Sequence, residues 1–184
     1  MRRFVIAALA VVAFALPARA ADVFQISSPA FKDGDMLPAT YMYQGIGIDK
    51  TPCGGQGISP PLAWTGAPEG TQSFAVAILD PDGFNGLGVS HWLMYNIPPT
   101  VTAVPQGAGS DAVPLYTQGT HQYGLTGFRG FCPPHGSSLH HYDMMVYALD
   151  LPPTLPAGLD RAHFLDTINH HVLRASSIVG RVGR

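Results

Sequence analysis

Two apolar runs joined by a short glycine-rich segment occupy residues 74–97, and they set the strongest limit on the fold. Phe74–Leu79 is an unbroken apolar run, which is typical of a strand buried on both faces. A second apolar run begins at His91 and ends at Ile97, and three glycines lie between the two runs. We therefore expect a hairpin of two buried strands with a turn at 83–89.

The ends of these two strands carry side chains that suggest a site. Asp80 and Asp82 directly follow the first run, and His91 opens the second. If the strands pair as a hairpin, the three side chains meet at one edge of a sheet. Pockets built where rigid strands meet loops are common places for binding and catalysis.

A second glycine- and proline-rich loop, at 127–136, leads in the same way to His140, and Tyr142 follows two residues later. We expect these two side chains to join the first three around one cavity. Imidazole, phenol and loop backbone groups are the hydrogen-bond donors that an oxyanion needs. A carboxylate beside a histidine also favours the charged imidazolium, which helps to hold an anion.

The first 20 residues have the pattern of a secretory signal peptide. Arg2 and Arg3 precede the 13-residue apolar run Phe4–Leu16, and an Ala-x-Ala sequence ends at Ala20. We expect cleavage after Ala20, which leaves one periplasmic or secreted domain at 21–184. No second long apolar stretch follows, so no stable membrane anchor is expected.

The charge and composition of residues 21–184 exclude some partners and favour a β fold. Loss of the three signal-peptide arginines leaves 7 Lys and Arg against 12 Asp and Glu, a net charge of −5. This acidic balance argues against nucleic acid and against electrostatic docking on anionic membranes. The chain has 21 Gly and 17 Pro, so turns are plentiful, and we expect a mainly β fold with few helices.

Local patterns predict the remaining elements. Asp160 can cap a helix over about 161–174 that has one apolar side. Further short strands are expected at Val23–Ile26, Tyr41–Tyr43, Met144–Leu149 and Ser177–Val182.

Cys53 and Cys132 are the two cysteines of the chain. In an exported protein an even pair favours one disulfide. Such a bridge would close a long loop and stabilise the fold by roughly 4 kcal/mol on the chain-entropy model. A two-cysteine metal site is the alternative, and neither cysteine has a Cys-x-x-Cys partner.

Three catalytic interpretations of the predicted site also remain open. A metal site could use the two aspartates with His91 and His140, although their spacing matches no familiar ligand motif. A glycosidase could use the aspartate pair, although side chains so placed can point to opposite faces. A serine hydrolase lacks its usual Gly-x-Ser-x-Gly sequence here, and its candidate nucleophiles are Ser59, Ser90 and Ser137.

From about residue 26 to 182 the chain resembles the phosphatidylethanolamine-binding protein family, in particular its bacterial Raf-kinase-inhibitor-like branch. Each motif alone is weak, but their joint order and spacing are highly specific. The motifs are Phe31-Lys32-Asp33-Gly34-Asp35, Ile58-Ser59-Pro60, Leu62-Ala63-Trp64, Asp80-Pro81-Asp82, His91-Trp92, Tyr95-Asn96-Ile97-Pro98, Gly130 with Pro133-Pro134 and Gly136, His140 with Tyr142, and Val146-Tyr147-Ala148-Leu149.

The resemblance implies a large central antiparallel sheet, a smaller sheet packed on it, and few helices, one of them near the C-terminus. It also implies a binding or regulatory protein rather than an enzyme, with no cofactor. The implied ligand is a phosphate-type anion or a phospholipid head group, and the implied protein partner is a protein kinase or a protease that the chain inhibits. The implied pocket residues are Asp80, Asp82, His91, Pro133, His140 and Tyr142.

The chain departs from the family pattern after Asp82. The family continues with Ala-Pro, where this chain has Gly83-Phe84, and the cis peptide bond that often precedes that proline would be costly before phenylalanine. An aromatic residue that commonly lines the pocket is replaced by Val89-Ser90. Secreted bacterial members often have a cysteine at the position of Cys132, which implies a bridge to Cys53 that ties two pocket loops together.

Overall fold

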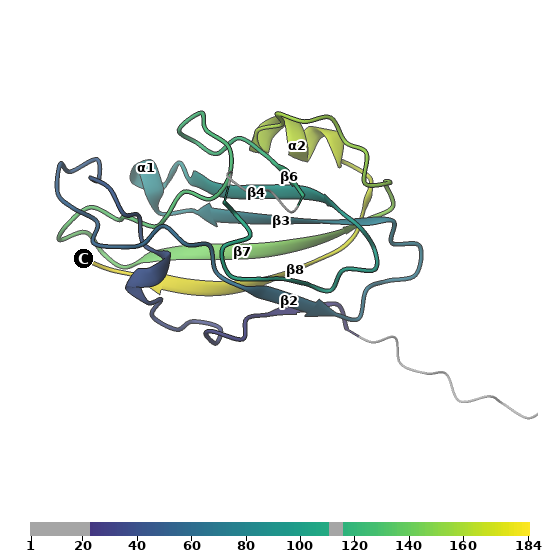
Figure 1. Ribbon diagram of the computed structural model, residues 1–184, viewed down its shortest axis with the longest axis horizontal. Helices are drawn as coiled ribbons and strands as arrows, with labels where there is room; N and C mark the ends of the chain where they lie inside the picture. Colours follow the sequence, from purple (N-terminus) through teal and green to yellow (C-terminus); the bar gives the residue numbers. More distant parts are fainter. Residues whose placement is uncertain (1–22, 111–115) are drawn as a thin grey trace, which may run out of the picture.

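The computed structural model describes residues 23–110 and 116–184, which form two antiparallel sheets (Figure 1). The predicted signal peptide lies outside the described residues. The larger sheet has the strand order β6-β4-β3-β7-β8, and the smaller has the order β1-β2-β5. The strands are β1 (Gln25–Ser27), β2 (Leu62–Thr65), β3 (Ser73–Asp80), β4 (Val89–Ile97), β5 (Ala103–Val104), β6 (Thr117–Gln118), β7 (His140–Leu149) and β8 (Val172–Val182). The short helices are η1 (Ala39–Tyr41, a 3-10 turn), α1 (Gly83–Gly86) and α2 (Arg161–Thr167).

The large sheet is covered on both faces, which explains the apolar character of its central strand. The small sheet packs on one face, where Trp64 lies 5.3 Å from Phe74 between ring centroids. Helix α2 packs on the other face through Phe164 and Ile168 (Figure 1). Every residue of β3 except Leu79 is therefore buried. The prediction of a mainly β fold, with a small sheet on a large one, is confirmed.

The predicted hairpin is present, and its turn has an unusual backbone. Strands β3 and β4 pair antiparallel, with Asp80 opposite Val89. The turn between them contains α1, in which Phe84 and Asn85 have φ values of 49° and 58°. Positive φ is rare for a bulky residue such as phenylalanine. All peptide bonds in the described residues are trans, as expected for a turn without the family's proline.

The predicted C-terminal helix was too long. Asp160 caps α2 as expected, because its Oδ1 accepts a hydrogen bond from the backbone N–H of His163 at 2.9 Å. The helix ends at Thr167, however, and β8 already begins at Val172. Strand β8 pairs along the whole length of β7, and this long ladder outweighs the local helical spacing of apolar residues.

Other boundaries also differ from the prediction. The expected strand at Tyr41–Tyr43 was wrong: η1 ends there, and Met42 forms a single bridge with Phe131. The opening strand begins two residues later and ends one residue later than predicted, and β4 begins two residues before His91. These short segments pair with distant parts of the chain, which local patterns do not reveal.

The predicted disulfide is present and joins two loops. Cys53, in the irregular segment 45–57, is bonded to Cys132, in the segment 127–136, with the two Cα atoms 5.4 Å apart. The guanidinium of Arg184 lies beside this bridge. It donates hydrogen bonds to the carbonyl groups of Pro133 at 3.0 Å and Pro52 at 2.8 Å. The two loops are thus held together covalently and by a shared cation.

Residues 31–37 run along one end of the outer strand β8. The backbone N–H groups of Gly34 and Leu37 donate to the carbonyl groups of Val179 and Arg181, both at 2.8 Å. The backbone N–H of Arg181 donates in return to the carbonyl of Asp35 at 2.9 Å. This stretch of sheet edge therefore has its backbone groups paired.

Candidate functional site

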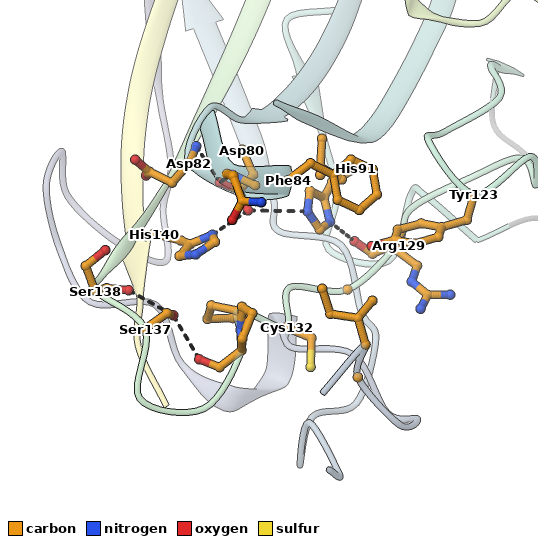
Figure 2. A pocket seen from close by; sticks show the side chains of 18 residues that line it. Asp80, Asp82, Phe84, His91, Tyr123, Arg129, Cys132, Ser137, Ser138 and His140 are labelled. Carbon is orange, nitrogen blue, oxygen red and sulfur yellow. Dashed lines mark hydrogen bonds and ion pairs between the residues drawn. The ribbon is translucent and has the colours of Figure 1, made fainter. Parts of the chain in front are cut away.

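Three adjacent strands bring one carboxylate and two imidazoles together. Asp80 ends β3, His91 lies near the start of β4 and His140 opens β7. Because β3 lies between β4 and β7, the two histidines stand on either side of Asp80 (Figure 2). The three residues are buried, with exposed fractions of 3%, 5% and 7% respectively. The structure thus brings these predicted residues to one edge of the sheet, as the hairpin pattern and the second loop led us to expect.

The carboxylate of Asp80 is held by three hydrogen bonds, and His91 lies nearby. Its Oδ1 accepts hydrogen bonds from the backbone N–H groups of Asp82 at 3.0 Å and Gly83 at 2.9 Å. Its Oδ2 lies 2.7 Å from Nδ1 of His140 and 3.9 Å from Nε2 of His91. The contact with His140 is short enough for a hydrogen bond, and the contact with His91 is too long for one. Asp80 therefore orients His140 directly, so that the ring nitrogen facing away from Asp80 is Nε2.

His91 is held in one tautomer by the loop beside it. Its Nδ1 lies 2.8 Å from the backbone carbonyl of Arg129, so Nδ1 carries the proton and donates. Burial lowers the pKa of His91 to about 4, although the Arg129 carbonyl and the charge of Asp80 act in the opposite direction. At neutral pH the imidazole is uncharged, and its Nε2 is a hydrogen-bond acceptor.

These side chains lie in a pocket of about 400 Å³. Its walls come from the strand ends, from the α1 turn, and from the two loops joined by the disulfide (Figure 2). Pro133 lines the pocket as predicted, beside Pro134. Other lining residues are Ile48, Asp82, Phe84, Tyr123, Arg129, Gly130, Cys132, Ser137 and Ser138.

Asp82 lines the pocket, but its carboxylate is engaged with His141, the half-exposed neighbour of His140. The Oδ2 of Asp82 accepts hydrogen bonds from the backbone N–H of His141 at 2.8 Å and from Nδ1 of the same residue at 2.9 Å. The backbone hydrogen bond is the main effect that lowers the pKa of Asp82. His140 and His141 point to opposite sides of β7, so each aspartate has its own histidine.

Tyr142 does not line the pocket. It is fully buried, with its ring centroid 4.0 Å from that of Phe131 and 5.3 Å from that of His91. Its hydroxyl forms no hydrogen bond with any described residue, and burial raises its pKa. The tyrosine supports the ring of His91 from behind, and its predicted contact with a ligand stays a prediction.

Sequence reasoning missed the cation of the site. Arg129 lines the pocket, and its guanidinium lies 3.8 Å from the ring centroid of Tyr43 and 4.3 Å from that of Tyr123. Both distances are typical of cation–π contacts. One signal could have identified it, because Arg129 is the single lysine or arginine in the loop 127–136.

The catalytic alternatives gain no specific support from the geometry. Within residues 23–110 and 116–184, no three His, Cys, Asp or Glu side chains are arranged to hold a metal ion. Of the candidate serines, Ser59 and Ser90 are buried. Ser137 lines the pocket, and its hydroxyl donates to the carbonyl of Pro134 at 2.8 Å. Asp80 and Asp82 are each bound to a histidine rather than paired across a cleft.

The fold and this site at the strand ends define the class of protein. The model of the phosphatidylethanolamine-binding protein family matches residues 27–183, and the chain belongs to that family. Among its relatives is the UPF0098 protein YbcL of Escherichia coli, 43% identical over 143 residues, which are 76% of this chain and 75% of YbcL. The UPF0098 protein YbhB of the same organism is 36% identical over 158 residues, 84% of this chain and 96% of YbhB.

Solved structures agree with this assignment. The crystal structure of YbcL, described as a new member of the mammalian PEBP family, matches with a TM-score of 0.78 and 36% identity. The match covers 88% of this chain and 98% of the crystallised YbcL chain. The homologue CT736 from Chlamydia trachomatis matches with a TM-score of 0.74 and 26% identity, covering 89% of this chain and 99% of CT736.

One further relative bears on the predicted location. A Mycobacterium tuberculosis protein that carries a lipoprotein name, LppC, is 35% identical over 146 residues, which are 77% of this chain and 63% of LppC. Among the helices of the described residues, none has the length and apolar character needed to cross a membrane.

Proposed function

We propose that this protein binds a phosphate-type anion, of the kind found in phosphate esters and phospholipid head groups, in the pocket beside Asp80, His91 and His140. The observation that carries the proposal is the arrangement of His140. Its Nδ1 is bound to the buried carboxylate of Asp80 at 2.7 Å, and its Nε2 forms no hydrogen bond with any described residue. One ring nitrogen is therefore left for a ligand in the pocket.

What His140 can offer an anion depends on its Nε2. With its only proton on Nδ1, the ring presents a lone pair at Nε2, which repels an anion. In the imidazolium form Nε2–H is a donor, and a charged donor forms the stronger hydrogen bond to a phosphate oxygen. The form that binds an anion is therefore the imidazolium, whose Nδ1 faces the carboxylate of Asp80 at 2.7 Å.

Membership of the family supports a phosphate ligand, since its name refers to phosphatidylethanolamine. His91 adds a complementary group: its Nε2 is an acceptor at neutral pH, suited to a protonated phosphate oxygen or to the ammonium of a head group. Inhibition of a kinase or a protease stays a prediction from the resemblance, and the pocket geometry does not favour one over the other.

The test is a titration of the protein with inorganic phosphate and with phosphoethanolamine, followed by the NMR signals of the histidine rings. We expect the signals of His91 and His140 to shift, and the His140→Gln variant to bind at least about tenfold more weakly, because it lacks the charged donor. His171→Gln is the matched control, since His171 also pairs with an aspartate, Asp150, at 2.8 Å but is half-exposed. Unchanged His91 and His140 signals at saturating phosphate would refute the proposal.

A further inference from the structure

Among the described residues, the guanidinium of Arg129 has no ion-pair partner. Its Cζ lies over the rings of Tyr43 and Tyr123, at 3.8 and 4.3 Å from their centroids. Among the described residues, no carboxylate lies within ion-pair distance of it, and it donates no side-chain hydrogen bond. Rings that stack on a guanidinium leave its edge open, and the edge carries the five N–H donors. An acceptor with two oxygens in one plane can be bound there by two parallel hydrogen bonds.

Arg184 shows how a structural arginine is used elsewhere in this protein. Its guanidinium donates to the carbonyls of Pro52 and Pro133 and lies 3.7 Å from the carboxylate of Asp49. These contacts hold two loops together. Arg129 has stacking contacts but, among the described residues, no such acceptors, and it lines the pocket.

The charges around the pocket show why an unpaired cation matters. Asp80 and Asp82 both line the pocket, and both oppose the entry of an anion. His91 is uncharged at neutral pH because burial lowers its pKa to about 4. His140 can offset one carboxylate when it is protonated. Arg129 is the remaining cation on the wall, and it can offset the second.

We propose that Arg129 determines the specificity of this site, and that the edge of its guanidinium binds a terminal phosphate group, so that phosphomonoesters are preferred over phosphodiesters. A phosphomonoester has a charge near −2 at pH 7.5, whereas a diester has −1. The Coulomb energy with a fixed cation is proportional to the ligand charge, so the dianion gains about twice as much. This inference rests on the proposed anion-binding function and adds the class of phosphate.

The experiment compares ethyl phosphate, a monoester, with diethyl phosphate, a diester, by calorimetric titration at pH 7.5. The wild-type protein should bind ethyl phosphate at least about tenfold more tightly. Arg129→Gln should remove most of that preference. Arg129→Lys should restore only part of it, because lysine keeps the charge but lacks the two-pronged donor.

Two further variants make the result interpretable. Arg174→Gln removes the same charge from an exposed position opposite Ala148, at the other end of the β7–β8 pair, and should bind both probes as the wild type does. Tyr123→Leu keeps the charge but removes one stacking ring, and should weaken ethyl phosphate binding by about two- to threefold. The NMR signal of the His91 ring checks folding, since His91 is held by the backbone rather than the side chain of Arg129.

The outcomes separate this inference from the proposed function. If Arg129→Gln binds ethyl phosphate as tightly as the wild type, or if the wild type binds both probes equally, the inference is overturned and anion binding stands. If the wild type binds neither probe, both proposals fail. Glycerol 3-phosphate and dihexanoyl phosphatidic acid both present a terminal phosphate. Tighter binding of the second would assign the site to a lipid, and equal binding to a free ester.

Discussion

At the scale of single residues, the buried His91 makes the stability of the protein depend on pH. It is 5% exposed, and its Nδ1–H donates to the carbonyl of Arg129. Burial lowers its pKa to about 4, from an ordinary value of 6.5. Between these two values the unfolded chain binds a proton at this position and the folded protein does not. The free energy of unfolding therefore falls as the pH is lowered from 6.5 to 4.

We expect this one residue to account for a loss of roughly 3 kcal/mol of stability at pH 4 relative to pH 7. The measurement is urea unfolding at a series of pH values for the wild type and for His91→Asn. Asparagine keeps an N–H donor for the Arg129 carbonyl but does not titrate, so the slope between pH 6.5 and 4 should flatten.

His170→Asn is the control for this prediction, because His170 is exposed and asparagine tolerates its φ of 67°. Its pH profile should follow that of the wild type. Asp143, whose pKa burial raises, acts in the opposite direction, and it is present in every variant. A wild-type profile that is flat over this range, or that keeps its slope in His91→Asn, would contradict the assignment.

The site residues that could be predicted are those next to long apolar runs. Asp80, His91 and His140 lie at or near strand ends. The hairpin pattern predicted that the first two meet, and the similar loop before His140 predicted that the third joins them. Arg129 and His141 could not be found in that way. Their roles depend on contacts with Tyr123 and Asp82, which are set by how loops fold over the sheet.

At the scale of elements, the pocket loop 127–136 approaches the chain at 41–43 more closely than a side chain would allow. The backbone N–H groups of Phe131 and Tyr43 donate to the carbonyls of Tyr41 and Phe131, at 3.0 and 2.9 Å. A Cβ atom at Gly130 would lie 2.5 Å from the backbone N and Cα of Tyr43. Such an overlap can be relieved only if the two segments move apart.

We expect Gly130→Ala to lower the free energy of unfolding by about 2–3 kcal/mol. It should also weaken anion binding, because the side chain of Arg129 and the Arg129 carbonyl that accepts from His91 both move with the loop. Chemical denaturation and phosphate titration measure the two effects. Gly124→Ala is the comparison: its φ is 77° but no atom lies within 4 Å of the new Cβ, so it should cost only about 1 kcal/mol. Equal losses in the two variants would show that close packing at Gly130 is unimportant.

The elements that could be predicted are those whose own residues identify them. Strand β3 is one, because an unbroken apolar run indicates a strand that is buried on both faces. The predicted helix at 161–174 was too long because the spacing of Leu165, Ile168 and Val172 is helical. In the structure, Val172 instead pairs with Leu149 of β7. Pairing partners decide such cases, and they lie far away in the sequence.

At the scale of the whole molecule, the Cys53–Cys132 bridge closes a loop with a sequence separation of 79. The chain-entropy model gives about 4 kcal/mol for such a loop, and measured values are commonly lower. We expect the double variant Cys53→Ala with Cys132→Ala to lose about 2–4 kcal/mol in guanidinium unfolding. The wild type under reducing conditions should lose a similar amount, and the variant should not respond to reductant. A variant as stable as the oxidised wild type would contradict this prediction.

The complete architecture was predictable only through the family resemblance. Alternating and continuous apolar patterns indicate strands, but they do not give the order β6-β4-β3-β7-β8. That order depends on pairs such as β3 with β7, which join residues about seventy positions apart. The order and spacing of many short motifs supplied this information, since together they specify one known fold.

The backbone pairing of residues 31–37 with β8 has a consequence for how copies of this protein meet. Strand β8 is 11 residues long and forms the border of the large sheet. A bare border of that length would template intermolecular strand addition, the first step of many aggregation reactions. The Phe31-Lys32-Asp33-Gly34-Asp35 motif covers part of this border. A motif that helps to identify the family therefore also hinders edge-to-edge association between copies of the protein.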